Sequence, residues 1–331
     1  MLKAVAGGGG RGMRVVRSAH DLEPAWARCT SEATSAFGRG DVYAERLVPA
    51  ARHIEVQIVG DGTGAAVHLG ERDCSIQRRN QKLLEIAPAP GLSDELRHRI
   101  TGAAVALARS VRYANLGTVE FLVAARTHDE PGAAAPMELG ADAEVWFIET
   151  NARIQVEHTV TEEVTGLDLV EIQLRLAAGA TLADLGLAGP GDGSGAPVTG
   201  WAIQARINAE TIDPSGLTRP SAGTITAFEP AAGPGVRVDT AAHQGMVVNP
   251  AFDSLLAKLI VARRSGSFDG AANKLYRALC ETRIEGVDTN LDLLRSIVGH
   301  PQVGAATTGF LEANLGDLLD AVAHPRLHAG G

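Results

Sequence analysis

Polar and charged residues alternate with small and apolar ones between Glu149 and Glu157, where the chain reads E-T-N-A-R-I-Q-V-E. Side chains two residues apart in an extended strand share one face of a sheet. This spacing predicts one polar row made of Glu149, Asn151, Arg153, Gln155 and Glu157. At about 3.3 Å per residue the row would be roughly 26 Å long, enough to line nucleotide phosphates and a second small substrate. A half-buried strand with one solvated face is the alternative interpretation.

Two acidic residues could form a metal site. Glu120 in T-V-E-F-L-V and Glu149 in W-F-I-E-T-N lie on strand-like runs separated by a stretch rich in Gly, Ala and Pro. If the two strands pair across that stretch, both carboxylates meet Asn151. Oxygen ligands of this kind suit Mg²⁺, which also keeps waters and substrate phosphates. Two unrelated acids on solvated strand faces explain the pattern equally well.

The glycine-rich start of the chain could bind phosphate. Consecutive glycines let backbone N–H groups close around phosphate oxygens without a Cβ in the way. Lys3 and Arg11 would add positive charge, and the glycines are Gly7, Gly8, Gly9 and Gly10. The segment lacks the G-x-x-x-x-G-K-[ST] pattern, so it is not a Walker A loop. A plain glycine hinge is the alternative.

Two further groups of cations are less specific. Arg78, Arg79 and Lys82 fall within five residues of E-R-D-C-S-I-Q-R-R-N-Q-K and predict a local positive site, with a solvated loop as the alternative. Arg237 in G-V-R-V-D stands near His243 and carries no independent signal. A surface arginine on a strand is its simplest interpretation.

Composition limits the possible partners. The 331 residues carry 39 acidic and 30 basic side chains, a net charge of −9. This balance gives no general attraction to nucleic acid or to anionic membranes. Three cysteines without C-x-x-C spacing favour a reducing, cytoplasmic setting over disulfides or a zinc site. No apolar run approaches the roughly 18 residues of a membrane span.

The elements that position these residues alternate irregularly between strand and helix, which predicts an α+β fold. A helix is expected over Asp94–Arg112 with Ser93 as its N-cap. A long hairpin loop is expected over Thr127–Ala143. The other expected elements are strands His53–Val59, Ala65–Leu69, Thr118–Val123, Val145–Ile148, Thr224–Phe228 and Gly235–Asp239, and a helix over Phe268–Thr282.

A Gly/Pro-rich segment, Gly189–Gly200, reads as a flexible linker that divides the chain. The division predicts a first region over 1–188, with a lid over about 1–47, and a second region over 201–305. Residues 306–331 are expected to form a C-terminal tail.

Several long motifs of this chain resemble biotin carboxylase. They are Gly7 to Val16, E-R-D-C-S-I-Q-R-R-N-Q-K, T-V-E-F-L-V, E-T-N-A-R-I-Q-V-E-H-T-V-T-E-E-V-T-G and R-I-N-A-E. The resemblance, which runs from Lys3 to about Gly299, is greatest to the biotin carboxylase part of pyruvate carboxylase or of large acyl-CoA carboxylases. It implies the ATP-grasp fold, with a glycine-rich lid and a C-terminal subdomain. The implied reaction uses ATP, Mg²⁺ (or Mn²⁺) and bicarbonate to make carboxyphosphate, and then carboxylates carrier-bound biotin.

The resemblance assigns roles to the polar positions. It implies ATP binding by Lys3, Gly7, Gly8, Gly9, Gly10, Glu45, His53, Gln77 and Asn80. It implies a metal on Glu120, Glu149 and Asn151, and bicarbonate on Lys82, Arg153, Gln155, Val156 and Glu157. In the implied catalytic set, Glu157 is the base that takes the bicarbonate proton, Lys82 and Arg153 stabilise the developing charge, and Arg237 stabilises the enolate oxygen of biotin. The implied partners are a biotin carboxyl carrier domain, a carboxyltransferase component and further copies of the chain.

The chain departs from the family at two places. Asn80 stands where the family usually has histidine, so this position hydrogen-bonds without carrying charge. Family members carry an N-terminal subdomain before the lid, whereas Met1 falls just before Lys3. We therefore expect a fragment, a misplaced start or a truncation, with impaired activity. Two other classes stay open: an ATP-grasp ligase of the carbamoyl phosphate synthetase type, and a non-catalytic assembly module.

Overall fold

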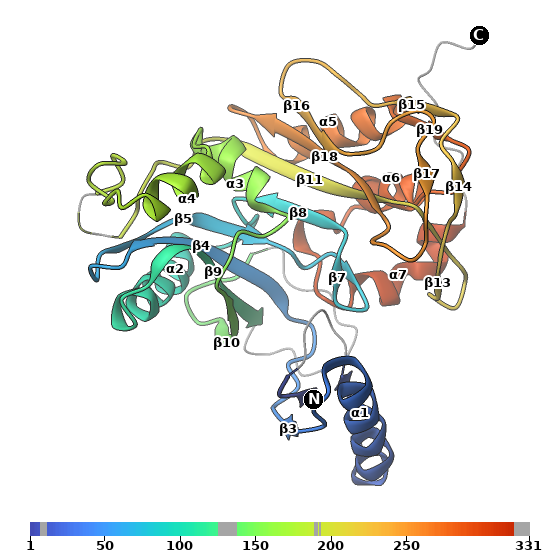
Figure 1. The fold of residues 1–331 in the computed structure, drawn as a ribbon, viewed down its shortest axis with the longest axis horizontal. Helices are drawn as coiled ribbons and strands as arrows, with labels where there is room; N and C mark the ends of the chain where they lie inside the picture. Colours follow the sequence, from blue (N-terminus) through green and yellow to red (C-terminus); the bar gives the residue numbers. More distant parts are fainter. Residues whose placement is uncertain (7–11, 125–137, 189–190, 192, 321–331) are drawn as a thin grey trace.

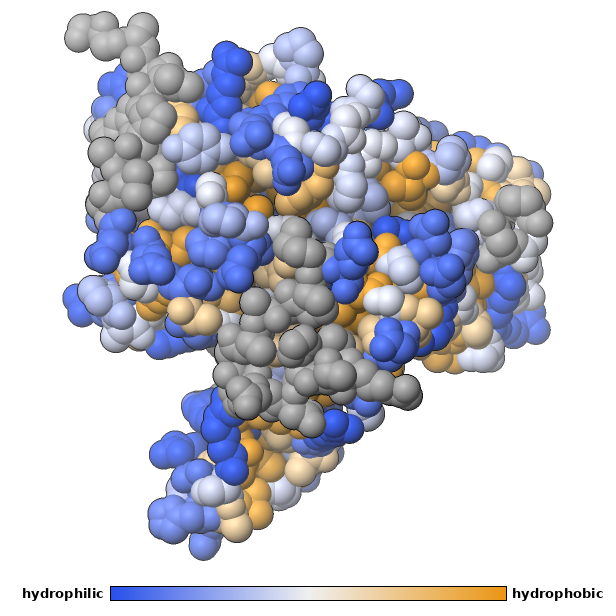
Figure 2. Space-filling view, turned by 180° about the vertical axis from the view of Figure 1, so that it is seen from behind, coloured by the Kyte–Doolittle hydropathy of each residue, from blue (hydrophilic) through white to orange (hydrophobic). Residues whose placement is uncertain are grey.

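The N-terminal lid is a small unit of three strands and one helix. The structure, a computed structural model, describes residues 1–6, 12–124, 138–188, 191 and 193–320. Strands β1 (Leu2–Ala4), β2 (Met13–Arg14) and β3 (Val42–Ala44) form an antiparallel sheet in the order β2-β1-β3. Helix α1 (Leu22–Phe37) packs on this sheet through a small buried core of Leu2, Ala25 and Cys29. The lid projects from the main body in both views (Figure 1, Figure 2).

The main body is organised around an eight-stranded sheet in the order β10-β9-β4-β5-β8-β11-β18-β16, in which each neighbouring pair is antiparallel. Strands from both regions of the chain belong to it, because β8 from the first region pairs with β11 from the second. The strands are β4 (Arg52–Asp61), β5 (Ala66–Asp73), β8 (Leu84–Ala87), β9 (Ala114–Ala124), β10 (Glu144–Asn151), β11 (Trp201–Asn208), β16 (Val236–Thr240) and β18 (Leu255–Arg263).

Helices cover both faces of the sheet (Figure 1). Helix α2 (Asp94–Ser110) starts at Ser93, whose hydroxyl accepts a hydrogen bond from the N–H of Leu96, and its apolar residues pack on β4 and β9. Helices α3 (His158–Thr165) and α4 (Leu169–Ala177) contribute to two further cores. The largest core lies between β8, β11 and β18 and helices α5 (Phe268–Glu281), α6 (Leu291–Gly299) and α7 (Phe310–Leu319).

Short elements complete the described chain. They are the hairpin β6 (Gln77–Arg78) and β7 (Gln81–Lys82), the strands β12 (Glu210–Ile212), β13 (Thr218–Pro220), β14 (Gly223–Thr224), β15 (Ala227–Glu229), β17 (Val247–Val248) and β19 (Arg283–Glu285), and two 3₁₀ turns at Ala19–Asp21 and Val303–Ala305. The expected strand Thr224–Phe228 is thus two short strands, β14 and β15, that pair with different partners. None of the described helices is long and apolar enough to cross a membrane.

The predicted hairpin around Thr127–Ala143 is confirmed by strand pairing, although residues 127–137 lie outside the described part. Strands β9 and β10 are antiparallel, and Glu149 stands opposite Glu120. The predicted strand over Glu149–Glu157 is wrong beyond Asn151, where β10 ends. Helix α3 starts directly after Glu157, and its apolar residues are buried against β8, β11 and β18. The chain must therefore leave the strand before Glu157. Burial of that helix face outweighs the strand-like alternation.

Two features differ from the expected division of the chain. In the described part of the predicted linker, the carbonyl of Gly193 accepts a hydrogen bond from the N–H of His68, and the N–H of Gly195 donates to the carbonyl of His68. This segment therefore packs on β5 rather than hanging free. The predicted tail contains α7, whose Phe310 and Leu318 are buried in the largest core.

Candidate active site

Lys82 lies at the centre of a group of buried carboxylates. It ends the β6–β7 hairpin, whose turn residues Arg79 and Asn80 both have positive φ values, 47° and 67°. Two consecutive residues of this kind match the twist of a tight hairpin. The Lys82 ammonium lies 2.6 Å from Glu55 and 3.4 Å from Glu120, and it also forms an ion pair with Glu157. A cation from a short hairpin thus neutralises carboxylates that come from three other segments.

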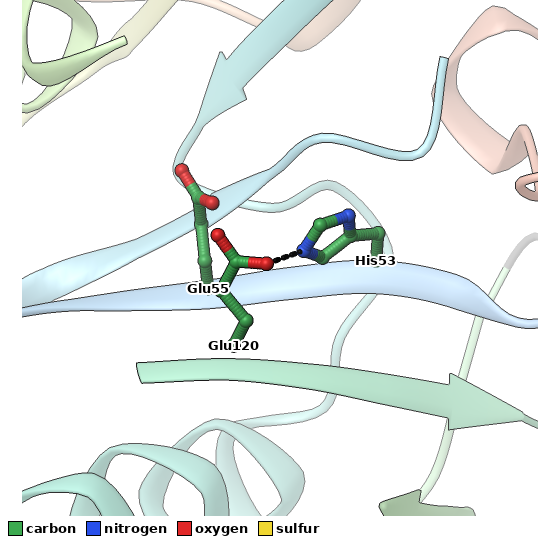
Figure 3. Close-up of side chains that lie close together, drawn as sticks. All are labelled: His53, Glu55 and Glu120. Atoms are coloured by element: carbon green, nitrogen blue, oxygen red, sulfur yellow. Dashed lines mark hydrogen bonds and ion pairs between the residues drawn. The ribbon is translucent and has the colours of Figure 1, made fainter. Parts of the chain in front are cut away.

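Strands β4 and β9 supply one side of the site through alternation of polar and apolar residues. His53 and Glu55 of β4 and Glu120 of β9 lie together. Their sequence neighbours Ile54 and Val119 point to the other face and pack in the core under α2. The Nε2 atom of His53 is 2.9 Å from Glu120 (Figure 3). Gln77 donates a hydrogen bond to the other ring nitrogen of His53 at 2.5 Å. The sequence places these residues far apart, and strand pairing brings them together.

The charges around these acids keep them ionised. Burial by itself would raise the pKa of Glu120, but the hydrogen bond from His53 and the charge of Lys82 outweigh it and lower the pKa to about 2. Burial likewise opposes ionisation of Glu55, yet Lys82 and Arg72 lower its pKa to about 2. Arg72 is fully buried and donates to Glu55 at 2.6 Å. Both carboxylates are therefore anionic over the whole physiological range.

Glu120, Glu149 and Asn151, which we predicted to form a metal site, do lie together. Asn151 donates to Glu120 at 2.9 Å and to Glu149 at 3.4 Å, while Glu149 remains exposed. Their oxygens are the hard ligands that Mg²⁺ prefers, and an exposed carboxylate leaves room for waters and phosphate oxygens. The donor set therefore fits Mg²⁺. Two tighter groups, one with His53 and the other with Cys74, share Glu55, whose charge Lys82 already neutralises.

The segment after β10 brings Gln155 and Glu157 into the site by a turn instead of a strand. Gln155 donates to Glu120 at 2.8 Å and accepts from Arg72 at 3.0 Å. The carboxylate of Glu157 is almost fully buried between Lys82 and Arg206. The carbonyl of Val156 accepts a hydrogen bond from Lys258. Gln155 and Glu157 belong to the predicted polar row, but they reach the site through this turn and not along a strand.

Arg206 is a site residue that our sequence reasoning missed. It lies on β11, donates to Glu157 at 2.9 Å, and is held by Glu85 of β8 at 2.5 Å. Burial would lower its pKa, but Glu85 and Glu157 outweigh that effect and raise it. The motif R-I-N-A-E contains this arginine. The available signal in the sequence was the spacing of Gln204 and Arg206, two residues apart on one strand face. In the structure Gln204 also donates to Glu85.

Arg237, expected beside the biotin oxygen, lies elsewhere. Its guanidinium contacts Glu162 at 2.7 Å, Asp239 at 2.8 Å and Glu163 at 3.6 Å, and it makes no hydrogen bond to Lys82 or Glu157 among the described residues. Arg237 lies on β16, which is at one edge of the sheet and, among the described strands, pairs only with β18. The arginine that reaches Glu157 is Arg206.

The remaining predicted residues are placed as follows. Arg153 is exposed and donates to the carbonyl of Ile154 at 3.2 Å and to Asn151 at 3.5 Å, so its guanidinium lies near one of the predicted metal ligands. Lys3 and Glu45 form an ion pair within the lid. Asn80 is exposed at the hairpin turn. Gly7, Gly8, Gly9 and Gly10 lie outside the described residues.

The chain is similar to known proteins along most of its length. Residues 1–185 match the carbamoyl-phosphate synthase L chain, ATP binding domain, and residues 204–313 match the biotin carboxylase C-terminal domain. The chain is 47% identical to pyruvate carboxylase of Aspergillus terreus over 302 residues, which are 91% of this chain and 23% of that protein. It is 45% identical to human mitochondrial pyruvate carboxylase, over 95% of this chain and 25% of that protein.

Solved structures show the same fold. The biotin carboxylase domain of Hydrogenobacter thermophilus 2-oxoglutarate carboxylase, in complex with MgADP, ADP and bicarbonate, has a TM-score of 0.84 and 40% identity, over 97% of this chain and 65% of that one. Campylobacter jejuni biotin carboxylase, in complex with a β-γ-ATP ligand, has a TM-score of 0.81 and 38% identity, over 94% and 64% of the two chains.

Fold and comparisons together define an ATP-grasp protein, and its described residues include a cluster of buried carboxylates. More narrowly, the chain belongs to the biotin carboxylase family. It spans about a quarter of the length of the curated relatives it matches.

Proposed function

We propose that the chain uses MgATP and bicarbonate to carboxylate biotin by way of carboxyphosphate. The observation that carries this proposal is the position of Glu157, buried between the cations Lys82 and Arg206. Lys82 also contacts Glu120, which stands opposite Glu149. A base held next to two cations suits removal of a proton from an anion, because the cations stabilise the dianion that forms. The biotin carboxylase relatives support the same reaction.

The first half of the reaction is a phosphoryl transfer. Glu157 takes the proton of bicarbonate as a bicarbonate oxygen bonds to the γ-phosphorus and the bond to ADP breaks. Lys82, Gln155 and Arg153 would hold the bicarbonate. Glu120 and Glu149, with Asn151 between them, would hold Mg²⁺. The metal ion would supply neutralisation of phosphate charge, the main requirement of such transfers.

In the second half, the carboxyl group passes from carboxyphosphate to a ureido nitrogen of biotin, and phosphate leaves. The departing phosphate takes the proton from that nitrogen, which places negative charge on the ureido oxygen. We assign Arg206, in place of Arg237, to stabilise that enolate oxygen. Its guanidinium already lies beside Glu157, so one cation can serve both the base and the acceptor.

The proposal includes the nucleotide and the partners. Lys3, Glu45 and the four glycines would close over ATP from the lid, and His53, Gln77 and Asn80 would face it from the body. Mn²⁺ would substitute for Mg²⁺. The partners are a biotin carboxyl carrier domain, a carboxyltransferase component and a second copy of the chain. The ATP-grasp region would span 1–188, and the C-terminal subdomain would begin at 201 and extend past 305 to include α7.

A test compares Glu157→Gln with Glu171→Gln, an exposed acid on α4. Bicarbonate- and biotin-dependent ATP hydrolysis should fall by about 10²–10⁴ in the Glu157 variant, the usual contribution of a general base. MgATP affinity, measured by calorimetry, should not change, and Glu171→Gln should behave as wild type. Normal turnover by Glu157→Gln would refute the assignment. Hydrolysis that responds to ammonia instead of biotin would favour a carbamoyl phosphate synthetase type of ligase.

A further inference from the structure

Arg237 belongs to a chain of charged groups along the outer edge of the sheet. It contacts Glu162 of α3 at 2.7 Å and Asp239 of its own strand at 2.8 Å. Asp239 stands opposite Lys258 of β18, and their charged groups are 3.1 Å apart. Burial would raise the pKa of Asp239, but its bonds to Arg237 and Lys258 outweigh that effect and lower it. The series of contacts therefore runs from Arg237 through the ionised Asp239 to Lys258.

Lys258 connects this edge of the sheet to the Val156–Glu157 segment. Its side chain is largely buried, and its ammonium donates to the carbonyl oxygen of Val156 at 3.1 Å. A buried ammonium is stable only when paired and hydrogen-bonded, so Asp239 and the Val156 carbonyl together account for its position. The peptide that it contacts joins Val156 to Glu157, the proposed base.

The contact between Lys258 and the Val156 carbonyl also affects the N–H group of Glu157. A trans peptide is planar, and its C=O and N–H groups point in opposite directions. Because the Val156 carbonyl faces Lys258, the N–H of Glu157 faces away from it. This N–H donates to no acceptor in the described part of the chain. Hydrogen bonds in series polarise one another, so a cation on the carbonyl strengthens the N–H as a donor.

We propose that Lys258, with Asp239 as its counter-ion, is a positioning residue for bicarbonate. It fixes the Val156–Glu157 peptide so that the N–H of Glu157 is presented to the substrate anion and the Glu157 side chain stays between Lys82 and Arg206. This inference rests on the proposed function. It gives the Arg237–Asp239–Lys258 series a role that a surface arginine alone would not have.

The test is bicarbonate saturation of ATP hydrolysis by the 331-residue chain. Lys258→Met removes the cation at similar length, and Lys258→Arg restores it. Lys274→Met is the matched control. Lys274 lies on α5, away from Glu157, and its ammonium also donates to backbone carbonyls, those of Pro234 and Ala262. We expect Lys258→Met to lose about tenfold or more in kcat/KM for bicarbonate, the scale of a hydrogen bond to a charged group. The KM for MgATP should not change.

Asp239→Asn provides a second, milder variant in case Lys258→Met does not fold. It should shift the bicarbonate KM in the same direction by a smaller factor, and Lys258→Arg should recover most of the loss. An unchanged bicarbonate KM in both Lys258→Met and Asp239→Asn overturns the positioning role while leaving the proposed function intact. An equal loss of kcat at saturating bicarbonate and MgATP in Lys258→Met and Lys274→Met also overturns it. Wild-type chain without bicarbonate-dependent hydrolysis overturns the proposed function itself.

Discussion

Replacing Lys82 with methionine should destabilise the fold in a way that depends on pH. The variant keeps the length of the side chain but removes an ammonium that contacts Glu55, Glu120 and Glu157. These carboxylates are buried, so they cannot recover the lost interaction from solvent. Removing one partner of a buried ion pair typically costs about 3–5 kcal/mol, because it leaves an uncompensated charge.

The pKa of Glu55 gives the net stabilisation of its charged form, to which Lys82 contributes. It is lowered from 4.5 to about 2, with burial opposing ionisation and Lys82 as the largest favourable charge. A difference of about 2.5 units at 1.36 kcal/mol per unit is about 3 kcal/mol, part of which Arg72 supplies. In the wild type this stabilisation is fully present above about pH 4.5 and is lost as the pH falls towards 2.

Lys82 is the largest charge that offsets burial of Glu55, so in Lys82→Met we expect burial to dominate and the pKa of Glu55 to rise above its unfolded value. The variant then takes up a proton on folding. Its deficit in the free energy of unfolding, relative to the wild type, should therefore be largest near pH 8. The deficit should shrink by up to about 1.4 kcal/mol per pH unit as the pH falls towards 5. Urea unfolding followed by circular dichroism at pH 5, 6, 7 and 8 measures this difference, with Lys274→Met as a control. A loss below about 1 kcal/mol, or one equal at every pH, would refute the reasoning.

Three further predictions concern the site and its support. Arg206→Met should lower biotin-dependent ATP hydrolysis by about 10²–10³, as loss of an oxyanion-stabilising donor does, whereas Arg237→Met should lower it by less than about tenfold; equal effects would contradict our choice of arginine. Glu149→Ala should raise the Mg²⁺ concentration needed for turnover while Arg153→Ala raises the bicarbonate KM, and identical titrations for both would show that the two functions are not separate. Arg52→Met should reduce the free energy of unfolding by about 3–5 kcal/mol, since Arg52 is fully buried against Asp73; a urea midpoint like that of the wild type would contradict this.

Local sequence rules predicted much of the frame around the site. Ser93 caps the predicted helix, which ends at Ser110, two residues early, because Arg112 adopts a positive φ of 49°. The pairing of Glu120 with Glu149 followed from two strand-like runs separated by a long loop. These features depend on hydrogen bonds and periodicities between near neighbours, which a single sequence displays.

The site itself depends on contacts that no local pattern specifies. Arg72 and Glu55 come from different strands and meet in a fully buried pair. Arg206 reaches Glu157 only because β11 pairs with β8 across more than a hundred residues of chain. The alternation at Glu149–Glu157 pointed to the right residues for an incomplete reason, because the packing of α3 ends the strand at Asn151. Sequence chemistry thus pointed to several of these residues but not to Arg206, and tertiary packing decided their arrangement.

The pairing of β8 with β11 has a consequence for how the polypeptide can be divided. Ladder hydrogen bonds join Leu84–Ala87 to Ala202–Ala205, and one buried core contains residues from both sides of that seam. A cut between α4 and β11 would therefore leave two fragments that still share a sheet. Each fragment alone would expose an unpaired strand edge and an open apolar face. Mixing the two should rebuild the sheet, which makes this region suitable for fragment complementation, with nucleotide binding as the signal of reassembly.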